Sequence, residues 1–325
     1  MQEFKVIELQ RQRDFGRKVN ATFEFIKQNF GPLFKSILFI AGPPVLLGSV
    51  LLGSFFGKLF GLSSIAATDP QGVTDFVSSA EFWLKLLFMF VFLLISGVIT
   101  ISTINNYIIL YGEKRSNQIE VGEVWQRVRE TFWMYLGTTL LFALLFVMFY
   151  VAMLIPLAIF GAISPVLVFL GFLGLACALV YLLISASLVF IIRANERLGF
   201  FEALTRSFKL VRNKWWSTFG LIIILYFIMG VISYIPLIPM YAALFINTMH
   251  SVEANPFETS TSWELWTTVF FTAYYLLQML LNTLPQIGIA FQYYNLVELK
   301  EAKSLLSDIG TIGQATAQER PEEQY

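Results

Sequence analysis

Two sets of polar residues lie at helical spacing inside apolar stretches of the chain. The stronger set consists of three amides, Gln278, Asn282 and Gln286. The milder set consists of three hydroxyls, Ser96, Thr100 and Thr103. Each set forms a polar stripe down one helix face. Because polar groups in hydrocarbon need hydrogen-bond partners, both stripes should face other helices or a wet cavity. We prefer packing between helices, and a polar substrate path between the two stripes is the alternative.

Other residue types that do chemistry are sparse. No acidic residue falls inside a predicted span, which weakens interpretations based on proton relays or ion-coupled transport. The single histidine, His250, lies in an outer loop, and the single cysteine, Cys177, lies in an apolar run. Neither belongs to a metal-binding or nucleophile motif. We therefore predict a protein that is not an enzyme and that holds no cofactor or metal.

The composition predicts a membrane protein. Of 325 residues, 57% are hydrophobic and 14% are charged, against about 25% charged in soluble domains. A spanning helix needs roughly 20 apolar residues, and six stretches qualify, at about 33–57, 82–110, 133–160, 165–192, 217–246 and 265–296. We expect an all-α, polytopic membrane helix bundle with six transmembrane helices. The six-span domain covers 32–300, between an N-terminal helix (1–31) and a polar tail (301–325).

Basic residues alternate between the loops. Nearly all of the 22 Lys and Arg precede the first, third and fifth spans or follow the sixth, and only Lys58 and Lys85 fall on the other side. The side that is rich in Lys and Arg faces the cytoplasm. This pattern predicts a multi-pass protein of the bacterial cytoplasmic (inner) membrane, with both termini in the cytoplasm.

Three amphipathic segments precede the first, third and fifth spans. In the third, Phe201, Leu204, Phe208 and Val211 step by three and four residues, which indicates one face of a helix dipped toward the acyl chains. Candidate contacts to anionic lipid headgroups on these segments are Arg127, Arg129, Arg206, Lys209, Arg212 and Lys214. The basic residues could bind anionic lipid, or could serve topology alone, or both. A helix tied to two spans is committed to the interface, so nucleic acid is not expected as a partner.

Small residues repeat every fourth position at the first span. They are Ser49, Gly53, Gly57 and Gly61. Such a ridge permits close approach of a neighbouring helix. Packing within the chain is the preferred interpretation, and a homo-oligomer face is the alternative. Pro43-Pro44 should break or bend this span, and Pro285 could kink the sixth.

The passage FFEALTRSFKLVRNKWWSTFGLIII, from 200, resembles the cytoplasmic loop and following span of a poorly characterised group of bacterial six-span proteins. That group is related to the membrane domain of glycerophosphodiester phosphodiesterases. The matching positions are Ala203, Ser207, Phe208, Leu210 and Trp215. The resemblance implies a six-span membrane domain, and it transfers no catalytic residue, since the residues after the sixth span are too few for a phosphodiesterase domain.

These observations lead to a function hypothesis with two alternatives. The leading hypothesis is a structural or accessory membrane protein, a scaffold for partner proteins or lipids. The first alternative is a permease-like transporter of a small or lipid-like substrate that uses the two polar stripes. A lipid-modifying enzyme comes last, because no nucleophile, base or metal set converges.

Overall fold

The computed structural model describes residues 6–65, 70–250 and 261–302, and the regular structure within these residues is entirely helical. The predicted all-α membrane bundle is therefore confirmed. By length and composition, five helices of the described residues could cross a membrane. They cover Gly42–Leu59, Ala80–Lys114, Val121–Ile163, Pro165–Glu196 and Phe200–Ala243. The N-terminal residues 1–5 and the tail residues 303–325 lie outside the described part.

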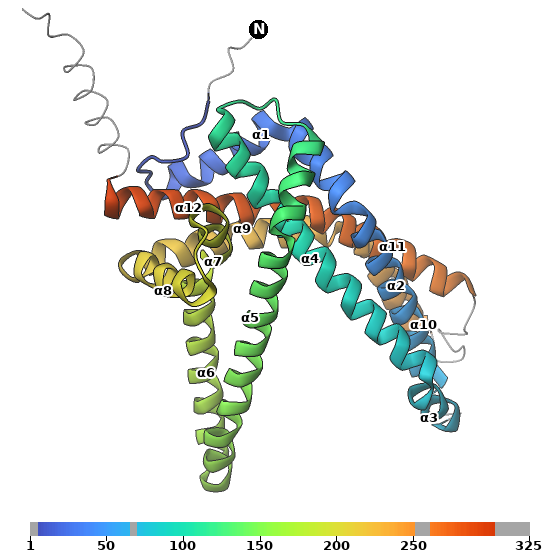
Figure 1. The fold of residues 1–325 in the computed structure, drawn as a ribbon. Coiled ribbons are helices and arrows are strands. Elements are labelled where there is room, and N and C mark those ends of the chain that lie inside the picture. Colours follow the sequence, from blue (N-terminus) through green and yellow to red (C-terminus); the bar gives the residue numbers. More distant parts are fainter. Residues whose placement is uncertain (1–5, 66–69, 251–260, 303–325) are drawn as a thin grey trace, which may run out of the picture.

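Two limbs diverge from a platform of helices (Figure 1). The first limb is a hairpin of α5 (Val121–Ile163) and α6 (Pro165–Ala186), joined at Ser164. The second limb consists of α2 (Gly42–Ile65), α3 (Pro70–Ser78), α4 (Ala80–Lys114), α10 (Ile238–His250) and α11 (Thr261–Leu281). The platform consists of α1 (Phe15–Ile40), α7 (Val189–Glu196), α8 (Phe200–Val211), α9 (Trp215–Ser233) and α12 (Thr283–Glu301). Two short 3-10 turns, Arg212–Lys214 and Ile235–Leu237, flank α9.

Helix α12 forms the centre of the platform. Every residue from Thr283 to Glu298 is buried, because α1, α4, α7, α8 and α9 pack around it. In Figure 1, α12 runs across the platform beside α1, well away from the tip of the α5–α6 hairpin. Its buried surface mixes aromatic rings with amides, so its burial depends on polar partners within the protein as well as on apolar contact.

The sixth predicted span, 265–296, is divided between α11 and α12. Pro285 has no N–H to donate to the carbonyl of Leu281, so the helical hydrogen-bond ladder is interrupted there. Asn282 separates the two helices, and the Thr283 hydroxyl donates to the carbonyl of Leu280 at 2.8 Å. Pro285 lies in the first turn of α12, where a missing N–H costs little. The kink expected at Pro285 is thus a helix boundary.

Two of the predicted amphipathic segments belong to long helices. The segment before the third span is the first part of α5, which at 43 residues is about 65 Å long. A hydrocarbon core is about 30 Å thick, so part of α5 stands outside it. The segment before the first span belongs to α1, which ends at Ile40, and a break at Ala41 precedes α2. By length and composition, the candidate span in the structure begins at Gly42, whereas the sequence predicts a start at about 33.

Three helices end in the same way. Arg115, Arg197 and Ala302 follow α4, α7 and α12 with left-handed φ angles of 49°, 56° and 46°. Each donates its backbone N–H to the carbonyl four residues earlier, at 2.9–3.0 Å. A left-handed residue with the same backbone hydrogen bond therefore ends each of these three helices.

Candidate functional site

The hydroxyl stripe of α4 is buried and pairs with its own helix. Ser96, Thr100 and Thr103 are each at most 6% exposed. Their hydroxyls donate to the carbonyls of Phe92, Ser96 and Ile99 at 2.6–2.7 Å. Each hydroxyl thus satisfies its donor four residues back along α4. This arrangement fits packing between helices.

The amide stripe is divided by the boundary between α11 and α12. Gln278 and Asn282 are half-buried at the end of α11, whereas Gln286 is 9% exposed in α12. The three amides therefore do not lie on one continuous helix.

The small-residue ridge packs within the chain, against α11. Ser49 is buried, and a Cβ added at Gly53 would lie 2.6 Å from the Cα of Thr268. A Cβ added at Gly57 would lie 3.0 Å from the Cα of Glu264. These glycines allow the backbones of α2 and α11 to touch. The side-chain environment of Gly61, the fourth member, lies outside the described residues.

The six candidate headgroup residues separate into two groups. Arg206 shares its guanidinium between Glu196 and Glu301, the latter at 2.8 Å, and Arg127 pairs with Glu113. These two arginines therefore differ from the expectation of open headgroup contacts. The other four are exposed, and their side chains form no ion pair within the described residues. They are Arg129, Lys209, Arg212 and Lys214.

A buried lysine, which the sequence reasoning did not identify, joins α1 to the centre of the platform. Lys18 is 2% exposed, and its Nζ donates to Oε1 of Gln292 at 2.6 Å and to Oγ of Ser217 at 2.8 Å. Nε2 of Gln292 in turn donates to the hydroxyl of Thr218 at 2.8 Å. The chain Ser217–Lys18–Gln292–Thr218 thus links α1, α9 and α12.

Lys18 lies on the buried face of α1, whereas three phenylalanines of this helix are exposed. The apolar residues Phe15, Phe23 and Phe30 are exposed, whereas the buried face of α1 is the mixed one, with Lys18, Ala21, Thr22, Phe25, Asn29, Leu33, Ser36, Ile37 and Ile40. In a membrane protein the apolar face can turn outward to lipid while polar groups pair inside. The exposed phenylalanines thus lie on the face expected to meet the acyl chains, and Lys18 lies on the buried face of α1.

Burial lowers the pKa of Lys18 to about 8, and the positive charge of Lys214 adds to this effect. The carboxylate of Asp14 acts in the opposite direction and more weakly. The partners of the ammonium are an amide oxygen and a hydroxyl oxygen, both neutral. The surroundings of Lys18 therefore hold an excess of positive charge.

Ser217 also lines an open groove of about 900 Å³ between α6 and the start of α9. The residues of α6 that line the groove are Ala176, Cys177, Val180 and Tyr181. From the 3-10 turn and α9 it takes Arg212, Asn213, Lys214, Trp215, Trp216, Ser217 and Phe219. The lining from α6 is mostly apolar, and the lining from the 3-10 turn includes two basic residues, Arg212 and Lys214.

A second polar network fixes α7 against α12. Nδ2 of Asn195 donates to the hydroxyl of Tyr293 at 3.0 Å, and that hydroxyl donates to Oε1 of Glu196 at 2.7 Å. The hydroxyl of Tyr294 donates to Oδ1 of Asn195 at 3.2 Å. Since Glu196 also pairs with Arg206 of α8, the network connects three helices of the platform.

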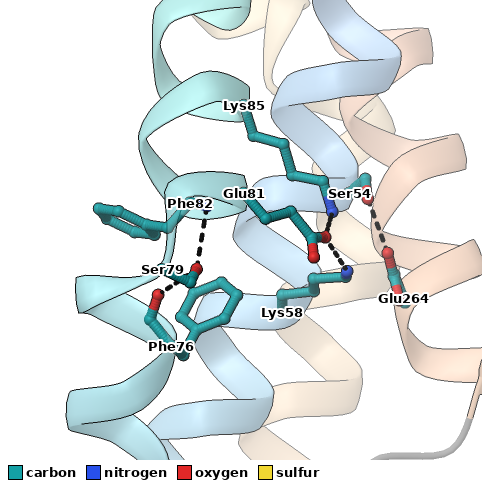
Figure 2. Close-up of polar contacts among 8 residues, drawn as sticks. All are labelled: Ser54, Lys58, Phe76, Ser79, Glu81, Phe82, Lys85 and Glu264. Atoms are coloured by element: carbon teal, nitrogen blue, oxygen red, sulfur yellow. Dashed lines mark hydrogen bonds and ion pairs between the residues drawn. The ribbon is translucent and has the colours of Figure 1, made fainter.

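Charged residues also meet on the second limb, far from the platform (Figure 2). Glu81 of α4 pairs with Lys85 and lies 3.6 Å from the ammonium of Lys58 on α2. Ser54 of α2 donates to Oε1 of Glu264 on α11 at 2.6 Å. Lys58 and Lys85 are the two exceptions to the basic-residue pattern, and the same carboxylate offsets both charges.

Within the described residues, His, Cys, Asp and Glu side chains form no group of three that could hold a metal ion. No curated protein and no solved structure matches the chain. Residues 36–295, which include both polar networks apart from Lys18, match a single family model. The chain therefore belongs to the family described as Domain of unknown function (DUF7847).

Proposed function

We propose that the protein is a non-enzymatic structural or accessory membrane protein that acts as a scaffold for partner proteins or lipids. The observation that carries this proposal is the internal pairing of its polar groups. The hydroxyls of α4 bond to their own helix, and Lys18, Gln292 and Thr218 bond to one another. The α4 hydroxyls can therefore be buried without an outside partner, and the bonds of Lys18 and Gln292 hold α1, α9 and α12 together. This leaves the two limbs as the parts available to partners.

The α5–α6 hairpin is the limb best suited to meet a partner within the bilayer. Along its outer part, side chains such as Ile155, Phe169 and Phe172 are at least 65% exposed. Gly174 of α6 has open space where a side chain would lie, whereas a Cβ at Gly171 would lie 2.8 Å from the ring of Phe160 on α5. Gly174 thus marks the outer face of the hairpin, and Gly171 marks the contact between its two helices.

The experiment is affinity purification of the tagged chain from membranes in mild detergent, with stoichiometry measured by quantitative mass spectrometry. We expect at least one membrane protein, a second copy included, at a fixed ratio. Gly174→Trp should reduce that ratio without loss of the chain from the membrane. Asn282→Leu is the control and should retain the partner, because among the described residues the side chain of Asn282 has no hydrogen-bond partner to lose.

Two results would contradict the scaffold proposal. One is a chain that purifies alone, as a monomer, from several detergents. The other is a solute flux in proteoliposomes that depends on the wild-type chain and is abolished by Asn282→Leu, which would favour the permease alternative.

We further propose that the membrane is the cytoplasmic membrane of a bacterium and that both termini are cytoplasmic. The support is the distribution of Lys and Arg, together with the pairing of Lys58 and Lys85 by Glu81. The amphipathic segments would then lie at the membrane interface. The chain would also be related to the membrane domain of glycerophosphodiester phosphodiesterases. A C-terminal reporter that is active only outside the cytoplasm would overturn the orientation.

A further inference from the structure

We propose that the groove between α6 and α9 binds one anionic phospholipid, with the headgroup at Arg212 and Lys214 and an acyl chain along Cys177 and Val180. This inference goes beyond the scaffold role and stands independently of it. It is argued from the shape of the groove, its aromatic wall and its uncompensated positive charge.

The groove has the size and lining of a lipid site. Its volume of about 900 Å³ lies within the range of roughly 300–1,000 Å³ found for ligand pockets. Ala176, Cys177 and Val180 give α6 an apolar surface there, and α6 belongs to a candidate membrane span. The apolar lining of the groove therefore belongs to a helix that is long and apolar enough to lie among acyl chains.

Aromatic rings build a fixed wall on the other side. Trp215 stacks on Tyr181 with ring centroids 5.7 Å apart, and on Phe219 with centroids 5.1 Å apart. Its indole N–H donates to the carbonyl of Tyr181 at 3.4 Å, which joins α9 to α6. Trp216 meets Trp215 edge to face and is 78% exposed. Tryptophan is enriched at the level of lipid headgroups, so this wall marks the depth at which a headgroup would lie.

The charge at the mouth of the groove lacks compensation from the protein. Arg212 and Lys214 are exposed, and within the described residues neither side chain forms an ion pair or a hydrogen bond. Nearby Arg206, by contrast, is held by two carboxylates. Behind the wall, Lys18 donates to Ser217, which itself lines the groove, so a third positive charge lies close to the same point.

Charge complementarity and apolar lining together specify the occupant. A phosphate beside Arg212 and Lys214 would also accept a hydrogen bond from the hydroxyl of Ser217, whose oxygen already accepts one from Lys18. A free anion would leave the apolar part of the groove unused, and a zwitterionic lipid would leave the positive charge without net compensation. An anionic phospholipid would place its charged headgroup beside the basic residues and an acyl chain against the apolar lining.

The test uses the purified, delipidated full chain in dodecyl maltoside, with added dioleoylphosphatidylglycerol or dioleoylphosphatidylcholine. Native mass spectrometry counts retained lipids. Alkylation of Cys177, the only cysteine in the chain and an exposed one, reports occupancy of the groove. We expect one phosphatidylglycerol to be retained, with alkylation slowed at least threefold, and little effect of phosphatidylcholine.

The decisive variants change exposed residues only. The double variant Arg212→Gln/Lys214→Gln should bind phosphatidylglycerol about tenfold or more weakly, since each basic residue near a surface contributes to attraction, and should lose the protection of Cys177. Arg129→Gln removes an exposed arginine of α5 that does not line the groove, and this variant should behave as wild type. Val180→Trp should exclude the lipid by filling the apolar end.

Several outcomes would overturn the proposal. They are equal retention of both lipids, protection of Cys177 that survives in the double variant, and equal protection by glycerol phosphate, which carries no acyl chain. If Arg129→Gln lowers the retention of phosphatidylglycerol as much as the double variant does, the lipid is attracted by diffuse charge and not by a site.

Discussion

The ammonium of Lys18 lies 2.6 Å from Oε1 of Gln292, 274 residues further along the chain. This contact joins the first described helix to the last, in a position that water scarcely reaches. An amide in the middle of α12 thus takes the place that a carboxylate would normally hold beside a buried lysine. Because the partner is neutral, the charge of Lys18 is solvated by dipoles and remains close to its titration range.

The stability of the protein should therefore rise with pH through the titration of Lys18. The pKa is 10.5 in the unfolded chain and about 8 in the folded one. Between these pH values the unfolded state binds more protons, so the free energy of unfolding increases with pH. The gain amounts to at most about 3 kcal/mol. Unfolding in detergent followed by circular dichroism from pH 7 to 10.5 measures it.

The matched control for this pH dependence is Lys18→Met, which fills the same space without a titrating group. The rise between pH 8 and pH 10.5 should disappear in this variant. A wild-type protein whose stability does not rise over this interval, or rises no more than that of Lys18→Met, would contradict the lowered pKa of Lys18.

Gly53→Ala should destabilise the second limb. The added methyl would meet the backbone of Thr268 at 2.6 Å, and backbone cannot move aside as a flexible side chain can. We expect a loss of about 1–3 kcal/mol, typical of overpacking. Gly97→Ala in α4 is the control, because nothing lies within 4 Å of its added Cβ. The better helix propensity of alanine should there raise stability by up to about 1 kcal/mol. Equal effects at the two sites would show that α2 and α11 are not in contact.

Arg206 and Glu196 should be energetically coupled. Their side chains are 24% and 16% exposed, so the pair is partly shielded from water. A double-mutant cycle with Arg206→Gln and Glu196→Gln should give a coupling of about 1 kcal/mol, near the upper end for surface pairs. The coupling should fall at high salt. Strictly additive losses would indicate that Arg206 faces solvent, as its position in an amphipathic segment first suggested.

Replacing Arg115 by glycine should stabilise the end of α4. Its φ of 49° is left-handed, a conformation that glycine adopts without a steric penalty. We expect a gain of about 0.5–1 kcal/mol in thermal unfolding. Arg115→Val should instead lower the unfolding temperature, because a β-branched side chain is strained at this φ. A gain from valine would exclude the left-handed ending.

Local features of the fold were predictable, and the features that depend on distant partners were not. The ridge of Gly53 and Gly57 predicted close helix packing, and Pro285 predicted an interruption of the last helix, since both signals arise from a few neighbouring residues. Lys18 was missed because its partners lie on α9 and α12. The direction of the α1 face also depended on whether Phe15, Phe23 and Phe30 met lipid or protein. Similarly, the role of Arg206 was decided by Glu301, 95 positions away in the sequence.

The central position of α12 also fixes an order of events during synthesis. Residues 283–298 are the last of the described core to leave the ribosome, yet α1, α4, α7, α8 and α9 all pack on them. Until they emerge, Lys18 and Thr218 have no Gln292 to bond, and the two limbs lack the element between them. The earlier helices therefore cannot reach their final packing around α12 until residues 283–298 have been synthesised.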